Sequence, residues 1–403
     1  MTLTWAGAAD LPQVPFGRLF RRLDRAVPEA AEIVTAYTDG QVTLRSNRAK
    51  VGYHEAADLS GFKGVEVGDF VVHGLDILRG SVGIADSAGA ITSVCAVCEP
   101  IADLDPRYVA HVIRVQAASG FTRALARGIR EGGADFRRWG TLAELPIPMP
   151  PVEYQRAVCD YLDLETARID TLIDAQQRLI EMLRERRAGI ISHAVLGATE
   201  ARTHLRRLVD VIDCAHVTAE FVDDDRRFPV ASIRECQGAA VDLSTCNYTT
   251  LEFFNHLRAG DRSPRAGDLL FIRNVSVGLV SVVTPDLPQF AMGQETVLLR
   301  RKSSVHPTFL RYALIGAEAR HAIEGAMIGS TFRRINVSSI RSLPVATPPL
   351  EDQRRIAAYL DEQTGKVDVL ITEAERFIEL SRERRSALIT AAVTGQIDVR
   401  SGE

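Results

Sequence analysis

The chain has 403 residues, of which 46% are hydrophobic, enough for two to four domains with real cores. Its formal net charge of −4 excludes a uniformly basic surface, so any contact with nucleic acid must be local. The sequence contains no run of about 18 apolar residues and does not open with a basic-then-apolar signal pattern. We therefore expect no membrane span and a cytoplasmic location.

Residues 1–148 combine short β-rich runs with glycine and proline punctuation, which predicts an α/β domain. A Gly-Asp turn at residues 68–69 leads into an apolar run, and Ser-Val-Gly follows at residues 81–83. Phe-Arg-Arg at residues 136–138 lies near the end of this segment.

A long helix is predicted for residues 149–197. Two prolines at its start suit a first helical turn, and no further proline occurs until Pro229. Apolar side chains then recur in steps of four and three, which is the heptad spacing of a coiled coil. The stripe consists of Val158, Leu162, Glu165, Ile169, Leu172, Gln176, Leu179 and Leu183, continued by Ile190 and Ala194. A helix of about 40 residues, roughly 60 Å long, with so narrow a stripe needs a partner.

Residues 198–346 form a second segment that echoes the first. The Gly-Asp turn recurs at residues 267–268, Ser-Val-Gly at 276–278 and Phe-Arg-Arg at 332–334. These echoes indicate one fold that carries two diverged surfaces.

The helix is repeated in residues 347–403. Residues 343–395 align without a gap with residues 145–197, and about 25 of roughly 53 positions are identical. The nearest partner of each helix is its own duplicate, so we expect the two to pack together. The second helix should end near Gly395, with residues 396–403 as a frayed or strand-like tail.

Both repeats open with the same motif, Leu-Pro-hydrophobic-x-x-Pro-Pro-hydrophobic-Glu-x-Gln-Arg, at residues 145–156 and 343–354. This motif, followed by a long helix and repeated after a variable segment, resembles the specificity subunit of Type I restriction–modification systems. The stretch 213–218 with His216, the Gly-Asp strand at residues 267–268 and Gly-Ser-Thr at residues 329–331 also resemble family features.

The resemblance implies an α+β protein with a pseudo-two-fold internal repeat. Two α/β target recognition domains, residues 1–148 and 198–346, would alternate with two helical spacers, residues 149–197 and 347–403, packed as an antiparallel coiled coil. Each recognition domain would read one half of a split site in double-stranded DNA. The helices would space the domains and dock DNA methyltransferase subunits, two being the expected number, and through them the restriction subunits.

The sequence contains no catalytic constellation. The Pro-Pro pairs lack the flanking residues that a DNA adenine methyltransferase needs, and no glycine-rich loop for a methyl donor is present. Cys95 and Cys98 have half of a zinc-site spacing, but buried strand thiols are the better interpretation, and Cys214 with His216 is no better a metal site. We expect no cofactor, no metal and no turnover by the isolated chain.

Candidate DNA-binding residues lie near the repeated turns. Arginine favours guanine and asparagine favours adenine as bidentate partners in the major groove. The candidates are Arg79, Ser81, Arg137, Arg138, His216, Arg273, Asn274, Ser276, Thr331, Arg333, Arg334 and Asn336. The alternative for each is a solvated loop residue, and for His216 a structural turn.

The helix pair has its own candidate residues. They are Leu162, Leu172, Leu179, Leu183, Leu360, Leu370, Phe377 and Leu388. Replacement of Leu172 or Leu370 by aspartate is expected to separate the helices. The alternative function is a coiled-coil scaffold whose globular segments bind protein, because periodicity and charge alone would allow it.

Overall fold

The computed structural model describes residues 5–8, 10–48, 61–126, 136–223, 227–302, 305–328, 333–397 and 399. The chain divides into two compact units, one comprising Met1–Ala175 with Phe377–Glu403 and the other Gln176–Arg376. Each unit therefore holds one globular segment and about half of each long helix. None of the described helices combines the length and apolar character that crossing a bilayer requires.

The first globular segment is built on a four-stranded antiparallel sheet with the order β2-β9-β6-β7. Its strands are β1 (Gln13–Pro15), β2 (Phe20–Leu23), β3 (Val34–Ala36), β4 (Val42–Leu44), β5 (Lys63–Val65), β6 (Phe70–His73), β7 (Val82–Ile84), β8 (Gly89–Ile91), β9 (Cys95–Pro100) and β10 (Pro146–Pro148). Its helices are α1 (Pro106–Ala118), α2 (Phe121–Leu125) and α3 (Trp139–Ala143), with short 3-10 turns η1 (Ala6–Ala8), η2 (Phe16–Arg18), η3 (Arg45–Asn47) and η4 (Asp76–Arg79). Smaller sheets pair β1 with β10, β3 with β4, and β5 with β8.

The second globular segment repeats this plan with a sheet of order β12-β18-β15-β16, also antiparallel throughout. Its strands are β11 (Arg202–His204), β12 (Val209–Asp213), β13 (Pro229–Ala231), β14 (Asn247–Tyr248), β15 (Leu269–Ile272), β16 (Val280–Val282), β17 (Ala291–Met292), β18 (Thr296–Arg301) and β19 (Pro344–Ala346). Its helices are α5 (Leu251–Arg258), α6 (Pro307–Ile315), α7 (Ala317–Ala326) and α8 (Val337–Arg341), with 3-10 turns η5 (Leu205–Arg207) and η6 (Arg234–Cys236). The prediction of one fold occurring twice is therefore confirmed.

The Gly-Asp turn supports the central strand in both segments. Gly68 and Gly267 have φ angles of 93° and 85°, a left-handed conformation that favours glycine. The carboxylate of Asp69 accepts a hydrogen bond from the backbone N–H of Glu66 at 2.7 Å, and Asp268 accepts one from Arg265 at 3.0 Å. These aspartates close the turn that starts the strand, so their recurrence has a structural cause.

The core of the first segment is aromatic. Phe16, Phe20 and Phe70 are fully buried, with ring centroids 4.7 Å apart for the first two and 4.5 Å apart for the last two. Cys95 and Cys98 are buried in β9, and burial raises the pKa of each thiol to about 12. The interpretation of this cysteine pair as strand thiols is confirmed.

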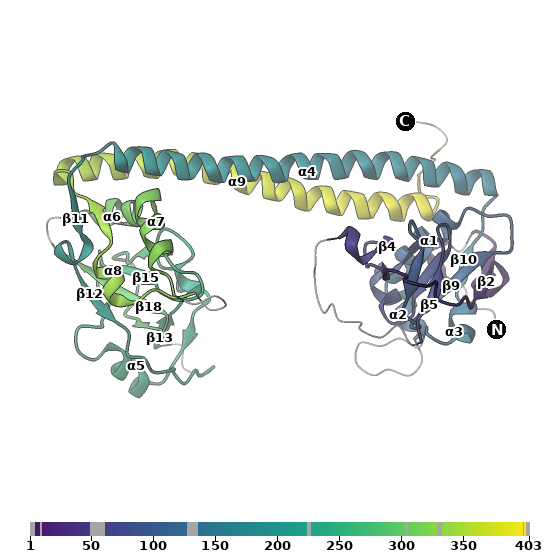
Figure 1. Cartoon of the computed structure of the whole chain (residues 1–403), viewed down its shortest axis with the longest axis horizontal. Helices are drawn as coiled ribbons and strands as arrows, with labels where there is room; N and C mark the ends of the chain where they lie inside the picture. Colours follow the sequence, from purple (N-terminus) through teal and green to yellow (C-terminus); the bar gives the residue numbers. More distant parts are fainter. Residues whose placement is uncertain are drawn as a thin grey trace. The chain divides into compact units, whose positions relative to one another are not determined.

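The two predicted long helices are α4 (Val152–Leu196) and α9 (Leu350–Val393), which pack antiparallel (Figure 1). α9 ends two residues before Gly395, as predicted. Gly395 has a φ of 73°, and the N–H of Gln396 donates to the carbonyl of Ala391 at 2.8 Å, which satisfies a terminal carbonyl of the helix. Most of the predicted tail, residues 398 and 400–403, lies outside the described residues.

The seam between the helices differs from the predicted stripe at two positions on each helix. Leu172, Leu179, Leu370 and Phe377 are 50%, 38%, 49% and 41% exposed, whereas the neighbouring Ile173, Ile180 and Ile378 are buried. Leu162, Leu183 and Leu360 are buried as expected, and Leu388 packs at the edge of the first core. At each shifted position the sequence has two adjacent apolar residues, and either one preserves steps of four and three. The pattern alone could not choose between two side chains about 100° apart on the helix.

Equivalent ion pairs join the helices in each unit. In the first unit, Arg385 donates to the carboxylate of Asp170 at 3.1 Å. In the second, Arg187 donates to Asp368 at 2.7 Å. Asp368 and Arg385 occupy the repeat positions of Asp170 and Arg187, so the same pair occurs twice with its partners exchanged between helices.

The glutamine of the repeated motif ties each long helix to its globular segment. The amide of Gln155 donates to the carbonyl of Pro150 at 2.8 Å, and its oxygen accepts from the N–H of Asp105 at 3.0 Å. Gln353 makes the same two bonds, to the carbonyl of Pro348 and from the N–H of His306, each at 2.8 Å. Asp105 and His306 are the residues that precede α1 and α6.

Candidate nucleic-acid interface

In the second segment, the loop that follows β15 lies beside residues 333–335. The N–H of Ile335 donates to the carbonyl of Arg273 at 3.0 Å, and Asn274 and Arg334 form an isolated β-bridge. Arg334 also exchanges backbone hydrogen bonds with Ile328 at 2.9 and 3.1 Å. Two of the stretches that the sequence singled out, far apart along the chain, are thus adjacent in the fold.

Three candidate side chains of this surface are exposed: Arg333, Arg334 and Asn336. Within the described part of the chain, none of them makes a side-chain hydrogen bond or ion pair. Asn336 is the N-cap residue of α8, but its side chain makes no capping hydrogen bond. Thr331, the remaining candidate of this stretch, lies outside the described residues. An unpartnered arginine beside another and next to an exposed amide is a suitable arrangement for phosphate and base contacts.

Arg273 is held by a carboxylate. One of its terminal nitrogens donates to both oxygens of Asp213, at 2.7 and 3.0 Å, and its side chain is only 18% exposed. The Nε2 atom of His216 lies 2.9 Å from the same carboxylate. His216 has a φ of 52°, so it serves as a turn residue as well as a neighbour of this ion pair. Asp213 begins the stretch 213–218 that the sequence singled out, but it was not among the candidate DNA-binding residues.

Asp213, Cys214 and His216 bring three potential metal ligands within 4.8 Å of one another. The carboxylate is already occupied by Arg273, a cation that would repel a metal ion. The thiol of Cys214 donates to the carbonyl of Gln294 at 2.8 Å, and burial raises its pKa, which disfavours the thiolate that metals require. This donor set fits a hydrogen-bonded turn.

The tip of the loop after β15 is strained. Val275 has a φ of 60°, unusual for a β-branched residue, and its side chain is 65% exposed. The side-chain oxygen of Asn274 accepts from the N–H of Val275 at 3.1 Å, and the N–H of Ser276 donates to the backbone carbonyl of Asn274 at 2.7 Å. Composition gave no signal for Val275, because only the backbone angle distinguishes it.

The first segment places equivalent stretches together. Gly74 follows β6, and a Cβ atom there would lie 2.9 Å from the backbone of Arg137, so glycine is needed for this approach. Arg79, Arg137 and Arg138 are exposed. Ser81 is the exception among the candidates, because it is 1% exposed and its hydroxyl faces the carbonyl of Ala36 at 3.4 Å. We assign Ser81 to the core.

The geometry defines a class of protein: two copies of one globular fold, each with an arginine-bearing loop surface, joined by paired long helices. Residues 254–375 match the family model described as the Type I restriction modification DNA specificity domain. The fold is similar to that of a chain from a solved structure that describes complex assembly and conformational transition of the type I R-M system. That similarity has a TM-score of 0.72 and 17% identity, over 96% of this chain and 99% of that one.

The HsdS subunit from Thermoanaerobacter tengcongensis is also similar, with a TM-score of 0.52 and 16% identity over 96% of this chain and 97% of that one. Residues 254–375 thus match a Type I specificity domain, and the whole chain has the fold of a Type I specificity subunit. The resemblance seen in the repeated motif is confirmed.

Proposed function

We propose that this chain reads a two-part, asymmetric site in double-stranded DNA, one part with each globular segment. The observation that carries the proposal is the repeated loop surface, by which we mean the loop after β6 with Arg137 and Arg138 in the first segment and the loop after β15 with Arg333 and Arg334 in the second. The side chains differ, because Arg273 and Asn274 in one segment replace Gly74 and Leu75 in the other. Equivalent surfaces with different side chains suit two different half-sites.

The pseudo-two-fold repeat supports an asymmetric target. A homodimer presents two identical surfaces and therefore matches a palindromic site. An internal duplication keeps the two-fold relation while it frees each surface to diverge. The paired helices would then set the length of the unread spacer, at about one helical turn of ~10 bp between half-site centres.

The overall charge of −4 favours DNA binding in which other subunits supply part of the affinity. We propose that α4 and α9 dock two DNA methyltransferase subunits, which in turn carry the restriction subunits, and that the chain itself has no turnover. Support comes from exposed apolar residues that repeat at matching positions. These are Leu172, Leu179 and Met182 on α4 and Leu370, Phe377 and Leu380 on α9. We call these six residues the outer stripe.

The first experiment is co-expression with a Type I DNA methyltransferase subunit, followed by single-molecule sequencing for modified adenines. A split, asymmetric methylated motif is the expected result, and exchange of residues 198–346 for those of a relative should change one half only. A stable complex that methylates no defined motif would contradict DNA specificity and favour the protein-binding scaffold. Methyl transfer by the purified chain alone would contradict its non-catalytic role.

A further inference from the structure

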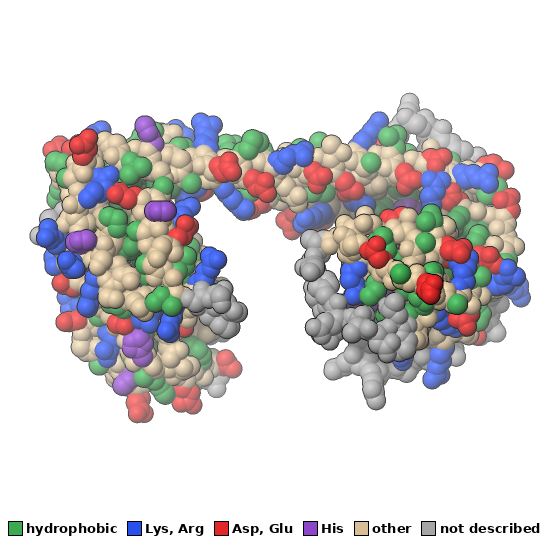
Figure 2. All heavy atoms as spheres, in the orientation of Figure 1, with side chains coloured by type: hydrophobic (Ala, Val, Ile, Leu, Met, Phe, Trp, Pro, Cys, Tyr) green, Lys and Arg blue, Asp and Glu red, His purple; other side chains and the backbone are tan. Residues whose placement is uncertain are grey.

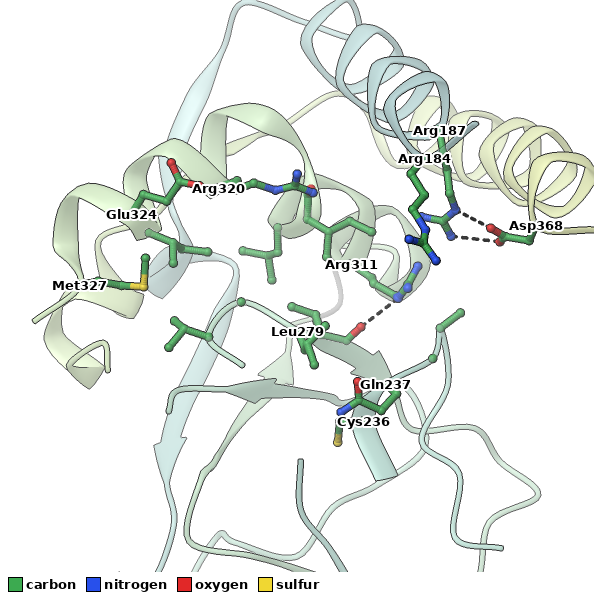
Figure 3. A pocket seen from close by; sticks show the side chains of 18 of the residues that line it. Arg184, Arg187, Cys236, Gln237, Leu279, Arg311, Arg320, Glu324, Met327 and Asp368 are labelled. Carbon is green, nitrogen blue, oxygen red and sulfur yellow. Dashed lines mark hydrogen bonds and ion pairs between the residues drawn. The ribbon is translucent and has the colours of Figure 1, made fainter. Parts of the chain in front are cut away.

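A cavity of about 670 Å³ lies within the second unit, where α4 and α9 meet α6, α7 and the loop that leads into β16 (Figure 3). This volume falls in the range of pockets that enclose small organic ligands. Arginines from three elements line it: Arg184 and Arg187 from α4, Arg311 from α6 and Arg320 from α7. Neither the repeated loop surface nor the outer stripe includes any of them.

The two arginines on α4 have acidic partners. Arg184 donates to Glu375 at 3.1 Å, and Arg187 donates to Asp368 at 2.7 Å. Figure 3 shows both side chains directed towards the end of the cavity where Arg311 lies. The acidic groups at this end are thus already in ion pairs.

Arg311 has no acidic partner among the described residues. Arg311 is only 7% exposed, and its Nε donates to the carbonyl of Val280 at 2.9 Å. Its Nη1 is buried and has no hydrogen-bond acceptor within the described ranges. Burial lowers the pKa of Arg311, and the charge of Arg187 adds to this effect, whereas Tyr312, Asp361 and Asp368 oppose it. A buried N–H of a charged group that has no acceptor is costly, and an anion would remove that cost.

The rest of the lining is largely apolar. Its apolar members include Leu279, Leu314, Ile323, Met327 and Ile371, and the carboxylate of Glu324 lies near Met327, away from Arg311 (Figure 3). The geometry points to a binding site for a small organic anion, whose carboxylate or phosphate pairs with Arg311 while its apolar body fills the remainder of the cavity.

The equivalent place in the first unit lacks this site. Ala110 of α1 stands at the helical position of Arg311, four residues after the proline that begins each helix. The arginine at this place is the half-buried Arg114, whose nitrogens donate to the carbonyl of Asp39 at 3.1 Å and contact the Nδ1 of His111 at 2.8 Å. The cavity at this place is smaller, about 280 Å³. The inferred site therefore belongs to one repeat only and does not follow from the shared scaffold.

The test is titration calorimetry on the full-length chain with four probes: phenyl phosphate, phenylacetate, inorganic phosphate and benzyl alcohol. We expect one molecule of an aryl anion to bind per chain, at least tenfold more tightly than inorganic phosphate or benzyl alcohol. The better of the two aryl anions identifies the head group. R311M should weaken that binding at least tenfold, and R311K, which keeps the charge but loses the fork, should weaken it less.

The matched control is R186M, on the same helix as Arg184 but outside the lining, which should bind as the unmodified chain does. Melting curves without ligand show whether R311M is folded. Unchanged binding of the aryl anion to a folded R311M would overturn the inference. Equally tight binding of benzyl alcohol would also overturn the inference, because the site would then have no preference for an anion. Equally tight binding of inorganic phosphate would overturn it because the site would then have no preference for an apolar body. If R311M does not fold, the test rests on R311K and R184M. Unchanged affinity of both variants for the aryl anion would then contradict the inferred anion site.

Discussion

Single polar residues connect the repeated helices to the globular segments. Gln155 and Gln353 are 1% and 3% exposed, and each bonds two backbone groups that would otherwise be buried without partners. The motif keeps glutamine because a side-chain amide both donates and accepts. The sequence showed that this residue recurs, but its partners Asp105 and His306 could not be predicted, because nothing local distinguishes them.

Replacement of Gln155 by alanine should lower the free energy of unfolding by about 3 kcal/mol, since two buried backbone groups lose their hydrogen bonds. Urea denaturation measures the change. Q177A, at an exposed position of the same helix, is the control and should change stability by less than about 0.5 kcal/mol. Equal effects of the two substitutions would contradict the role assigned to Gln155.

His111 gives the first unit a pH dependence. Burial, together with Arg114, Arg385 and Arg107, lowers its pKa from 6.5 to about 3. Below pH 6.5 the unfolded chain binds a proton that the folded chain does not, so stability falls as the pH falls from 6.5 towards 3, by up to ~1.4 kcal/mol per pH unit. H111Q should flatten this dependence in denaturation curves between pH 7 and 5. H256Q, at an exposed histidine, should leave it unchanged.

The exposed arginines of the repeated loop surface should act on DNA affinity. The double variant R333A/R334A is expected to weaken DNA binding by the assembled complex at least tenfold and to reduce the salt dependence of binding by about two phosphate contacts. Fluorescence anisotropy at several salt concentrations measures both. R376A, an exposed arginine of α9, is the control. A salt dependence that does not change would remove these residues from the interface.

In the helix pair, adjacent apolar residues have different roles: one packs in the seam and the next is exposed. Ile173 and Ile180 face the seam, whereas Leu172 and Leu179 face outwards. Figure 2 shows acidic and basic side chains intermixed along these helices. The sequence predicted the helices, their heptad spacing and their ends. It could not predict which member of each apolar pair faces inward, because the partner helix and the globular segments decide this together.

Two neighbouring substitutions test this separation. I173D should lower the free energy of unfolding by at least about 3 kcal/mol, because it buries a carboxylate in the seam. L172D should change stability by less than about 1 kcal/mol but weaken capture of methyltransferase subunits, as measured by native mass spectrometry. L164D, also on α4 and exposed but without an apolar counterpart at Glu362, is the control for capture. If L172D lost stability but still captured methyltransferase subunits, Leu172 would belong to the seam and not to the outer stripe.

At the scale of the whole molecule, the duplication was the most predictable feature, because about 25 of roughly 53 helix positions recur. The equivalence of the sheets was only suggested by three short echoes. Their strands have little sequence in common, since a buried strand requires apolar character more than identity. Ser81 illustrates the limit: its repeated Ser-Val-Gly suggested a surface loop, yet the side chain is buried.

If the helices set the spacer, their length should control the DNA target. Insertion of seven residues after both Arg178 and Arg376 preserves the heptad phase and adds about 10 Å to the pair at ~1.5 Å per residue. The methylated motif should then keep both half-sites and gain about three base pairs of spacer at ~3.4 Å each. Sequencing of modified adenines measures the spacer. An unaltered spacer in an active complex would contradict the proposal.

The exchanged ion pairs have a consequence for smaller chains. Asp170 faces Arg385, the duplicate of Arg187, and Arg187 faces Asp368, the duplicate of Asp170. In two separate copies of residues 1–197, each Asp170 could therefore meet the Arg187 of the other copy. The helix seam is thus self-complementary. Under the proposed function, a half-length chain that paired with a second copy of itself would present two identical surfaces, which suit a palindromic site.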